Sequence, residues 1–157
     1  MATRLRNESG LPWHRIISSD LKRAHETARV LAAQLGLDVE VDRRLRELDV
    51  GEWTGLTHSE IKDRDPETLR DFEAGEPSTR PGNGESRIEI RIRTRECVQD
   101  LAERYSGERL IVVTHLGVIR ALIPGSEPEN ASTILAHAEE IAARDVDAVR
   151  RPSDGPF

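Results

Sequence analysis

The order of apolar and polar positions in the first third of the chain predicts a strand, a helix and a second strand. Residues 14–20 (HRIISSD) contain a short apolar run, and the Ser18, Ser19 and Asp20 that end it are typical of a helix cap. Residues 21–35 repeat apolar residues at helical spacing, and Gly36 follows as a helix stop. Residues 38–42 (DVEVD) alternate as a half-buried strand does, so a parallel crossover unit is expected. The predicted helix stripe consists of Leu21, Ala24, Ala28, Leu31 and Leu35.

The rest of the chain predicts further helices and one more strand. Residues 45–55 (LRELDVGEWTG) show no regular pattern. Two short helices are expected after them, over residues 57–65 and 66–72. Residues 73–86 are rich in turn-forming residues and predict a surface loop. Residues 110–114 (LIVVT) are an apolar run of the kind found inside parallel sheets, and a helix is expected to begin near Gly117. Residues 136–157 predict a divergent tail that is partly helical or frayed.

Residues 86–105 allow two interpretations. Their first part, RIEIRIR, alternates like a strand, whereas the whole segment gathers apolar residues on one helical face. Because that face is continuous and Ser86 can cap a helix, a helix is predicted. Its expected buried residues are Ile90, Thr94, Cys97, Val98, Leu101 and Tyr105.

Composition narrows the class of protein without identifying a function. The 157 residues, of which 36% are hydrophobic, suit a single domain over residues 1–157. No apolar run is long enough to cross a membrane, and the N-terminal MATRLRNESG lacks the apolar region of a signal peptide. One cysteine excludes an internal disulfide, and a net charge of −6 argues against nucleic-acid binding. We expect a cytoplasmic protein without nucleic-acid or membrane partners, and a homodimer stays open.

Three polar residues follow the predicted strands, at the edge where open parallel sheets bind ligands. They are Arg23, Glu47 and His115. Arginine neutralises phosphate oxygens, histidine can donate a hydrogen bond to a transferring phosphoryl group, and a carboxyl group can protonate the leaving oxygen. The three residue types together predict a phosphate site. The other histidines and Cys97 are scattered, so neither a metal nor another cofactor is predicted.

Each of these residues also has a purely structural interpretation. Arg23 suits a solvated helix position, and Glu47 can pair with Arg43 or Arg44 on the surface. His115 ends an apolar strand, where a hydrogen-bonded structural histidine fits equally well. Spacing alone leaves both interpretations open.

Four segments, taken in order, resemble motifs of the histidine phosphatase superfamily, whose fold is phosphoglycerate-mutase-like. They are SSDLKRAHETA (18–28), LRELDVGEWTG (45–55), PGNGES (81–86) and VVTHLGVIRAL (112–122). Four ordered motifs are more specific than any one of them. The resemblance implies an α/β fold, a three-layer α/β/α sandwich with a mostly parallel sheet. It also implies that Arg23 and Leu116 bind the substrate phosphate, that Glu47 protonates the leaving group, and that His115 stabilises the phosphoryl group.

The sequence departs from the family in three places. The family begins with a central strand that ends in Arg-His-Gly, whose histidine is the nucleophile, and these 157 residues contain no Arg-His-Gly. We therefore expect the first central strand to be missing and the chain as written to be inactive. Leu116 replaces a small residue and is expected to crowd the backbone N–H that faces phosphate. The tail after Ser132 does not resemble the family's closing strand.

Three functions stay open. The first is a phosphomonoester hydrolase that acts on a small phosphorylated metabolite, because the short LDVGEWTG segment resembles the phosphatase branch. The second is a non-catalytic phosphate-binding protein that keeps Arg23 and His115, and the third is a phosphoglycerate-mutase-type phosphotransferase. An unrelated Rossmann-like domain is disfavoured, because no glycine-rich loop follows a strand.

Overall fold

Three parallel strands form a sheet at the centre of the computed structural model, which describes residues 12–126, 128–129 and 132–143. β1 (Arg15–Ser18) lies between β2 (Val39–Val41) and β3 (Leu110–Val113), and both pairs are parallel. The predicted crossover unit and the parallel arrangement of all three strands are confirmed.

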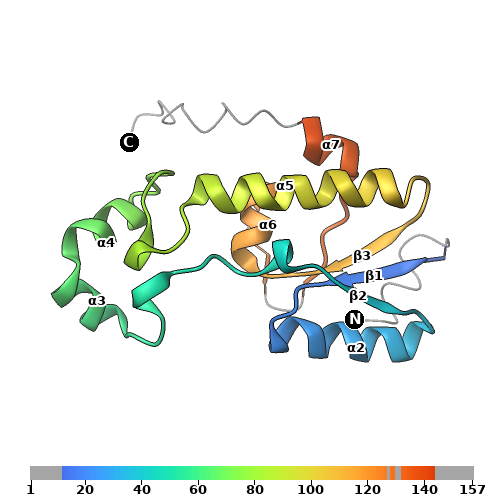
Figure 1. Cartoon of the computed structure of the whole chain (residues 1–157), viewed down its shortest axis with the longest axis horizontal. Helices are drawn as coiled ribbons and strands as arrows, with labels where there is room; N and C mark the ends of the chain where they lie inside the picture. The colour runs from blue at the N-terminus through green and yellow to red at the C-terminus, as the bar shows by residue number, and fades with distance from the viewer. Residues whose placement is uncertain (1–11, 127, 130–131, 144–157) are drawn as a thin grey trace.

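Helices cover both faces of this sheet (Figure 1). α2 (Lys22–Leu35) lies on one face, whereas α5 (Arg87–Arg104) and α6 (Leu116–Leu122) lie on the other. α7 (Ala138–Ala143) contacts α5, and the rest of the predicted tail, residues 144–157, lies outside the described residues. The three-layer α/β/α fold implied by the family resemblance is therefore confirmed.

Alternation along β1 divides the apolar core between the two faces. Ile16 packs against Ala28 and Leu31 of α2, and its register partners are Val39 of β2 and Ile111 of β3. Ile17 points to the opposite face and belongs to the cluster formed with α5 and α6. Both isoleucines are fully buried, and each such burial contributes about 1.5–3 kcal/mol.

α5 settles the ambiguity of residues 86–105 in favour of the helix. Ser86 Oγ accepts a hydrogen bond from Glu89 N (3.3 Å), and the Glu89 carboxylate accepts one from Ser86 N (2.9 Å). This reciprocal capping box fixes the helix start. The predicted buried face is confirmed except that Tyr105 is half-buried, and Arg91 and Arg95 are buried in addition.

The start of α2 differs from the prediction. The N-cap residue is Leu21, and it has no side-chain cap. Ser19 Oγ instead accepts a hydrogen bond from Leu21 N (3.2 Å), and the Asp20 carboxylate pairs with Arg46 Nε (2.6 Å). The polar residues before α2 therefore fix the loop rather than cap the helix.

Two short helices, α3 (His58–Arg64) and α4 (Pro66–Glu73), extend beyond the end of the sheet (Figure 1). Trp53 anchors them through one hydrogen bond and one ring contact. Its Nε1 donates to Asp65 Oδ2 (3.1 Å), and its ring meets that of Phe72 edge to face, with 5.8 Å between the centroids. Three 3-10 helices, at Arg43–Leu45, Gly51–Trp53 and Pro81–Asn83, were not predicted. In the described ranges, no helix combines the length and apolar character needed to cross a bilayer.

Candidate active site

The loops that leave the three strands meet at one edge of the sheet. Ser19, which follows β1, donates its backbone N–H to Val113 O of β3 (3.0 Å). Thr114, which follows β3, donates its hydroxyl to Leu45 O (2.8 Å), in the segment after β2. These bonds join the three loops directly, so residues distant in sequence are held beside one another.

His115 lies at the centre of this edge, as the N-cap residue of α6, and only 7% of it is exposed. Its Nε2 lies 2.9 Å from Ser19 Oγ. Ser19 Oγ also accepts a hydrogen bond from the N–H of Leu21 (3.2 Å), so it links His115 to the start of α2. Sequence reasoning assigned Ser19 to helix capping and missed this contact.

The environment of His115 favours the neutral imidazole. Burial lowers the pKa of His115 below its ordinary value, and the positive charge of Arg23 lowers this pKa further. The negative charge of Glu47 acts in the opposite direction. The three predicted residues therefore lie close enough to interact electrostatically, although their catalytic roles stay predictions.

The Glu47 carboxylate lies against the first turn of α6. Its Oε1 accepts hydrogen bonds from Gly117 N (3.0 Å) and Leu48 N (2.9 Å). A helix N-terminus stabilises such an anion through its free N–H groups. Gly117 leaves the space for this contact, because a Cβ there would lie 2.2 Å from Glu47 Oε1.

The structural alternative for Glu47, a surface ion pair, does not occur. Arg43 pairs with Asp20 (3.5 Å), and Arg44 pairs with Asp42 (2.8 Å). The neighbouring arginines are thus occupied by other carboxylates, and Glu47 is left to the α6 terminus.

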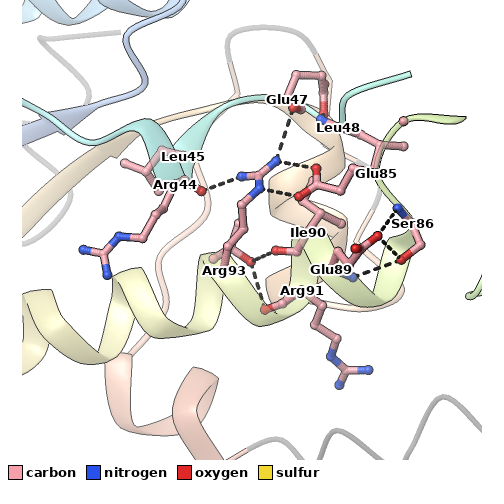
Figure 2. Close-up of polar contacts among 12 residues, drawn as sticks. Arg44, Leu45, Glu47, Leu48, Glu85, Ser86, Glu89, Ile90, Arg91 and Arg93 are labelled. Atoms are coloured by element: carbon pink, nitrogen blue, oxygen red, sulfur yellow. Dashed lines mark hydrogen bonds and ion pairs between the residues drawn. The ribbon is translucent and has the colours of Figure 1, made fainter. Parts of the chain in front are cut away.

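Arg93 of α5 supports the Glu47 segment from below (Figure 2). Its guanidinium donates to Arg44 O (2.6 Å) and to Glu47 O (3.2 Å), and it also binds both carboxylate oxygens of Glu85 (2.6 and 2.7 Å). Neither Arg93 nor Glu85 was predicted as a site residue. The only signal was Glu85 in the PGNGES motif, followed eight positions later by an arginine on the helix.

Arg23 and Leu116 flank the same edge. Arg23 is exposed on the first turn of α2, and its guanidinium forms no ion pair with any residue in the part of the chain that the structure describes. Leu116 is the first residue of α6, and 40% of it is exposed. Phosphate binding by both residues, and crowding by the Leu116 side chain, stay predictions.

The remaining reactive side chains lie elsewhere or are inert. His14 accepts a hydrogen bond at Nδ1 from Arg109 N (2.9 Å), which places it at the amino ends of the strands. Burial raises the pKa of Cys97 to about 12, so its thiol stays protonated. Within the described ranges, no group of three His, Cys, Asp or Glu residues is arranged to hold a metal ion.

Chemically, this edge combines an exposed guanidinium, a neutral imidazole and a carboxylate held at a helix N-terminus. A guanidinium binds an oxyanion, an imidazole N–H can donate to it, and a carboxyl group can exchange a proton with an attached oxygen. The set suits a phosphate ester better than an uncharged substrate.

Comparison with known proteins agrees with this chemistry. The profile of the Histidine phosphatase superfamily (branch 1) matches residues 1–139. Phosphoglycerate mutase-like protein 4 of Arabidopsis thaliana is 41% identical over 115 residues, which cover 72% of this chain and 50% of that protein. Glucosyl-3-phosphoglycerate phosphatase of Mycobacterium tuberculosis is 39% identical, over 68% of this chain and 51% of that protein. The chain thus spans about half the length of these relatives.

A solved structure gives the same result for the fold. The complex of a mycobacterial glucosyl-3-phosphoglycerate phosphatase with inorganic phosphate superposes with a TM-score of 0.67 at 36% sequence identity. The match covers 77% of this chain and 60% of that one.

Proposed function

The chain belongs to the histidine phosphatase superfamily, and from this membership we propose that it forms the core of a phosphomonoester hydrolase acting on a small phosphorylated metabolite. The geometry that supports the proposal is the position of Glu47 and His115 at the start of α6, together with the position of Arg23 on the first turn of α2, which follows β1. Phosphatase relatives of the kind described above support hydrolysis over mutase chemistry.

In this proposal each residue has one task. Arg23 and the backbone N–H of Leu116 bind the phosphate oxygens. His115 donates a hydrogen bond to the phosphoryl group as it transfers, and Glu47 in its protonated form gives a proton to the leaving oxygen. Ser19 holds the imidazole of His115 in place when the site is empty.

The nucleophile is the part of this proposal that the sequence does not supply. The five histidines include none in an Arg-His-Gly tripeptide, and His14 lies at the opposite edge of the sheet. We expect little or no hydrolysis by the 157-residue chain, and turnover when a strand that ends in Arg-His-Gly is joined to it. Loss of one essential member of a catalytic set costs about 10⁴–10⁶ in rate.

A second candidate function is that of a phosphate-binding protein without catalysis. Hydrolysis of 4-nitrophenyl phosphate by the chain with and without an added Arg-His-Gly strand separates the two. Restored turnover supports the hydrolase, whereas phosphate binding with no turnover in either form supports the non-catalytic protein. Conversion of one phosphorylated metabolite into an isomer, without release of phosphate, would instead indicate the mutase. A cytoplasmic location and a homodimer stay proposals of the sequence alone.

A further inference from the structure

We propose that Arg93 is a positioning residue that holds Glu47 beside the first turn of α6. This inference rests on the proposed role of Glu47 as proton donor. Arg93 touches no predicted phosphate-binding residue, and its polar contacts go to the backbone of the Glu47 segment and to Glu85 (Figure 2).

The first argument is the number and direction of these contacts. Arg93 reaches Arg44 O at 2.6 Å and Glu47 O at 3.2 Å, so it fixes the segment at two carbonyl groups on either side of Leu45 and Arg46. A guanidinium has a planar fork of donors that can serve two carbonyls and a carboxylate together, whereas a lysine ammonium is a single point charge.

The second argument is that Glu85 closes the network on the same segment. Its carboxylate binds Arg93 through both oxygens, and its backbone N–H donates to Asp49 O (2.7 Å), two residues after Glu47. The side chains of Arg93 and Glu85 are only 22% and 15% exposed, so solvent screens this pair less than it screens a surface pair. The Glu47 segment is thus held before and after the residue whose carboxylate it presents.

The third argument is the narrow space that the Glu47 carboxylate occupies. It lies 3.0 Å from Gly117 N, at a point where any side chain on Gly117 would collide with it. A small displacement of the segment would therefore break this contact, and such displacements cost activity when the group takes part in proton transfer. The charge of Arg93 also acts on His115, where it lowers the pKa.

The experiment is NMR on the 157-residue chain, with Arg93→Gln as the variant and Arg104→Gln as the matched control. Both arginines lie on α5 and pair with a glutamate, but Arg104 binds Glu40 of β2 (2.6 Å) and not the Glu47 segment. The amide of Gly117 is hydrogen-bonded to Glu47 Oε1, so its chemical shift and its hydrogen exchange report whether that contact is present. The readout is the Gly117 amide shift at one fixed pH, with Glu47→Gln as the reference in which the carboxylate is absent, and hydrogen exchange of the same amide.

We expect Arg93→Gln to move the Gly117 amide shift at least halfway from its value in the parent chain to its value in Glu47→Gln. We also expect Gly117 exchange to accelerate about tenfold more than that of the α2 amides, which report overall stability. Arg104→Gln should leave both quantities as in the parent chain. Arg93→Lys, which retains the charge, should show an intermediate loss and serves if the glutamine variant does not fold.

A Gly117 amide shift and exchange rate unchanged in the folded Arg93→Gln variant would overturn the inference, as would equal changes in Arg104→Gln. These results do not depend on turnover. Failure of the hydrolase proposal would appear separately, as an absence of phosphate release in the Arg-His-Gly form.

Discussion

Replacing Gly117 with alanine should separate the stability of the fold from the placement of Glu47. The added Cβ would lie 2.2 Å from Glu47 Oε1 and 3.3 Å from its Cδ, so the carboxylate must leave its position. The 3.6 Å approach to Ile90 Cδ1 is an ordinary contact. The backbone of Gly117 is not in the left-handed region, so alanine brings no strain there.

Two opposing effects set the size of the change. An alanine in a helix is favoured over glycine by up to about 1 kcal/mol. A lost hydrogen bond between an N–H and a carboxylate costs about 1.5–3 kcal/mol. For the Glu47 carboxylate we expect a cost near the lower value, because Glu47 is half-buried and water can replace part of the lost bond. The hydrogen bond outweighs the helix propensity, so we expect Gly117→Ala to lower the free energy of unfolding by about 0.5–2 kcal/mol.

The control is the same substitution in a Glu47→Ala background, with urea unfolding followed by circular dichroism. Without the carboxylate there is nothing to displace, so Gly117→Ala should then stabilise the chain by up to about 1 kcal/mol. An equal loss of stability in both backgrounds would refute the reasoning, because the cost would then come from some contact other than Glu47.

The other predictions concern catalysis, pH and packing. In the chain joined to an Arg-His-Gly strand, Glu47→Gln should slow hydrolysis of an alkyl phosphate at least tenfold more than that of 4-nitrophenyl phosphate, whose leaving group needs no proton. In the same form, Arg23→Ala should raise KM and lower kcat, because a guanidinium binds the phosphate of the substrate and binds the transferring phosphoryl group of the transition state more strongly; a change in KM alone would mean equal binding in both states and would contradict this. Because the pKa of His115 is lowered on folding, the unfolded chain takes up its proton first, and unfolding free energy should fall as pH drops below about 6.5. His115→Gln should flatten that part of the pH profile, and an unchanged slope would show that other groups cause it. Gly84→Ala should destabilise the chain by about 1–3 kcal/mol in urea unfolding, because its Cβ would lie 2.2 Å from Asp49 O. A neutral effect would mean that this loop is not held against the Asp49 segment.

Periodicity was sufficient to predict the strands and long helices, because apolar burial decides them. The run around Ile16 and Ile17 and the stripe containing Ala28 both have the burial that their spacing predicts. The end-of-strand rule then led to Arg23, Glu47 and His115 without any knowledge of distances.

The supporting contacts could not be predicted, because they join residues far apart in the sequence. Ser19 and His115 are separated by 96 positions, and Arg93 and Glu47 by 46. Arg93 reads in the sequence as one of many arginines on a polar helix face, and its partners are mostly backbone carbonyls, which leave no residue pattern. The 3-10 helices were missed for a related reason, since they depend on the contacts of irregular segments with α4 and α5 and with one another.

The central claim is that His115 faces a bound phosphoryl group with Arg23 beside it. The most direct measurement is an NMR titration of the His115 imidazole in the 157-residue chain with inorganic phosphate. We predict a saturable shift of the imidazole signals and a rise in the pKa of His115, since a bound anion favours the imidazolium. Arg23→Ala should weaken the phosphate affinity at least tenfold, whereas Lys22→Ala on the same helix turn should not. Imidazole signals of His115 that do not change with phosphate would contradict this claim. A phosphate affinity of Arg23→Ala equal to that of the parent chain would contradict it as well.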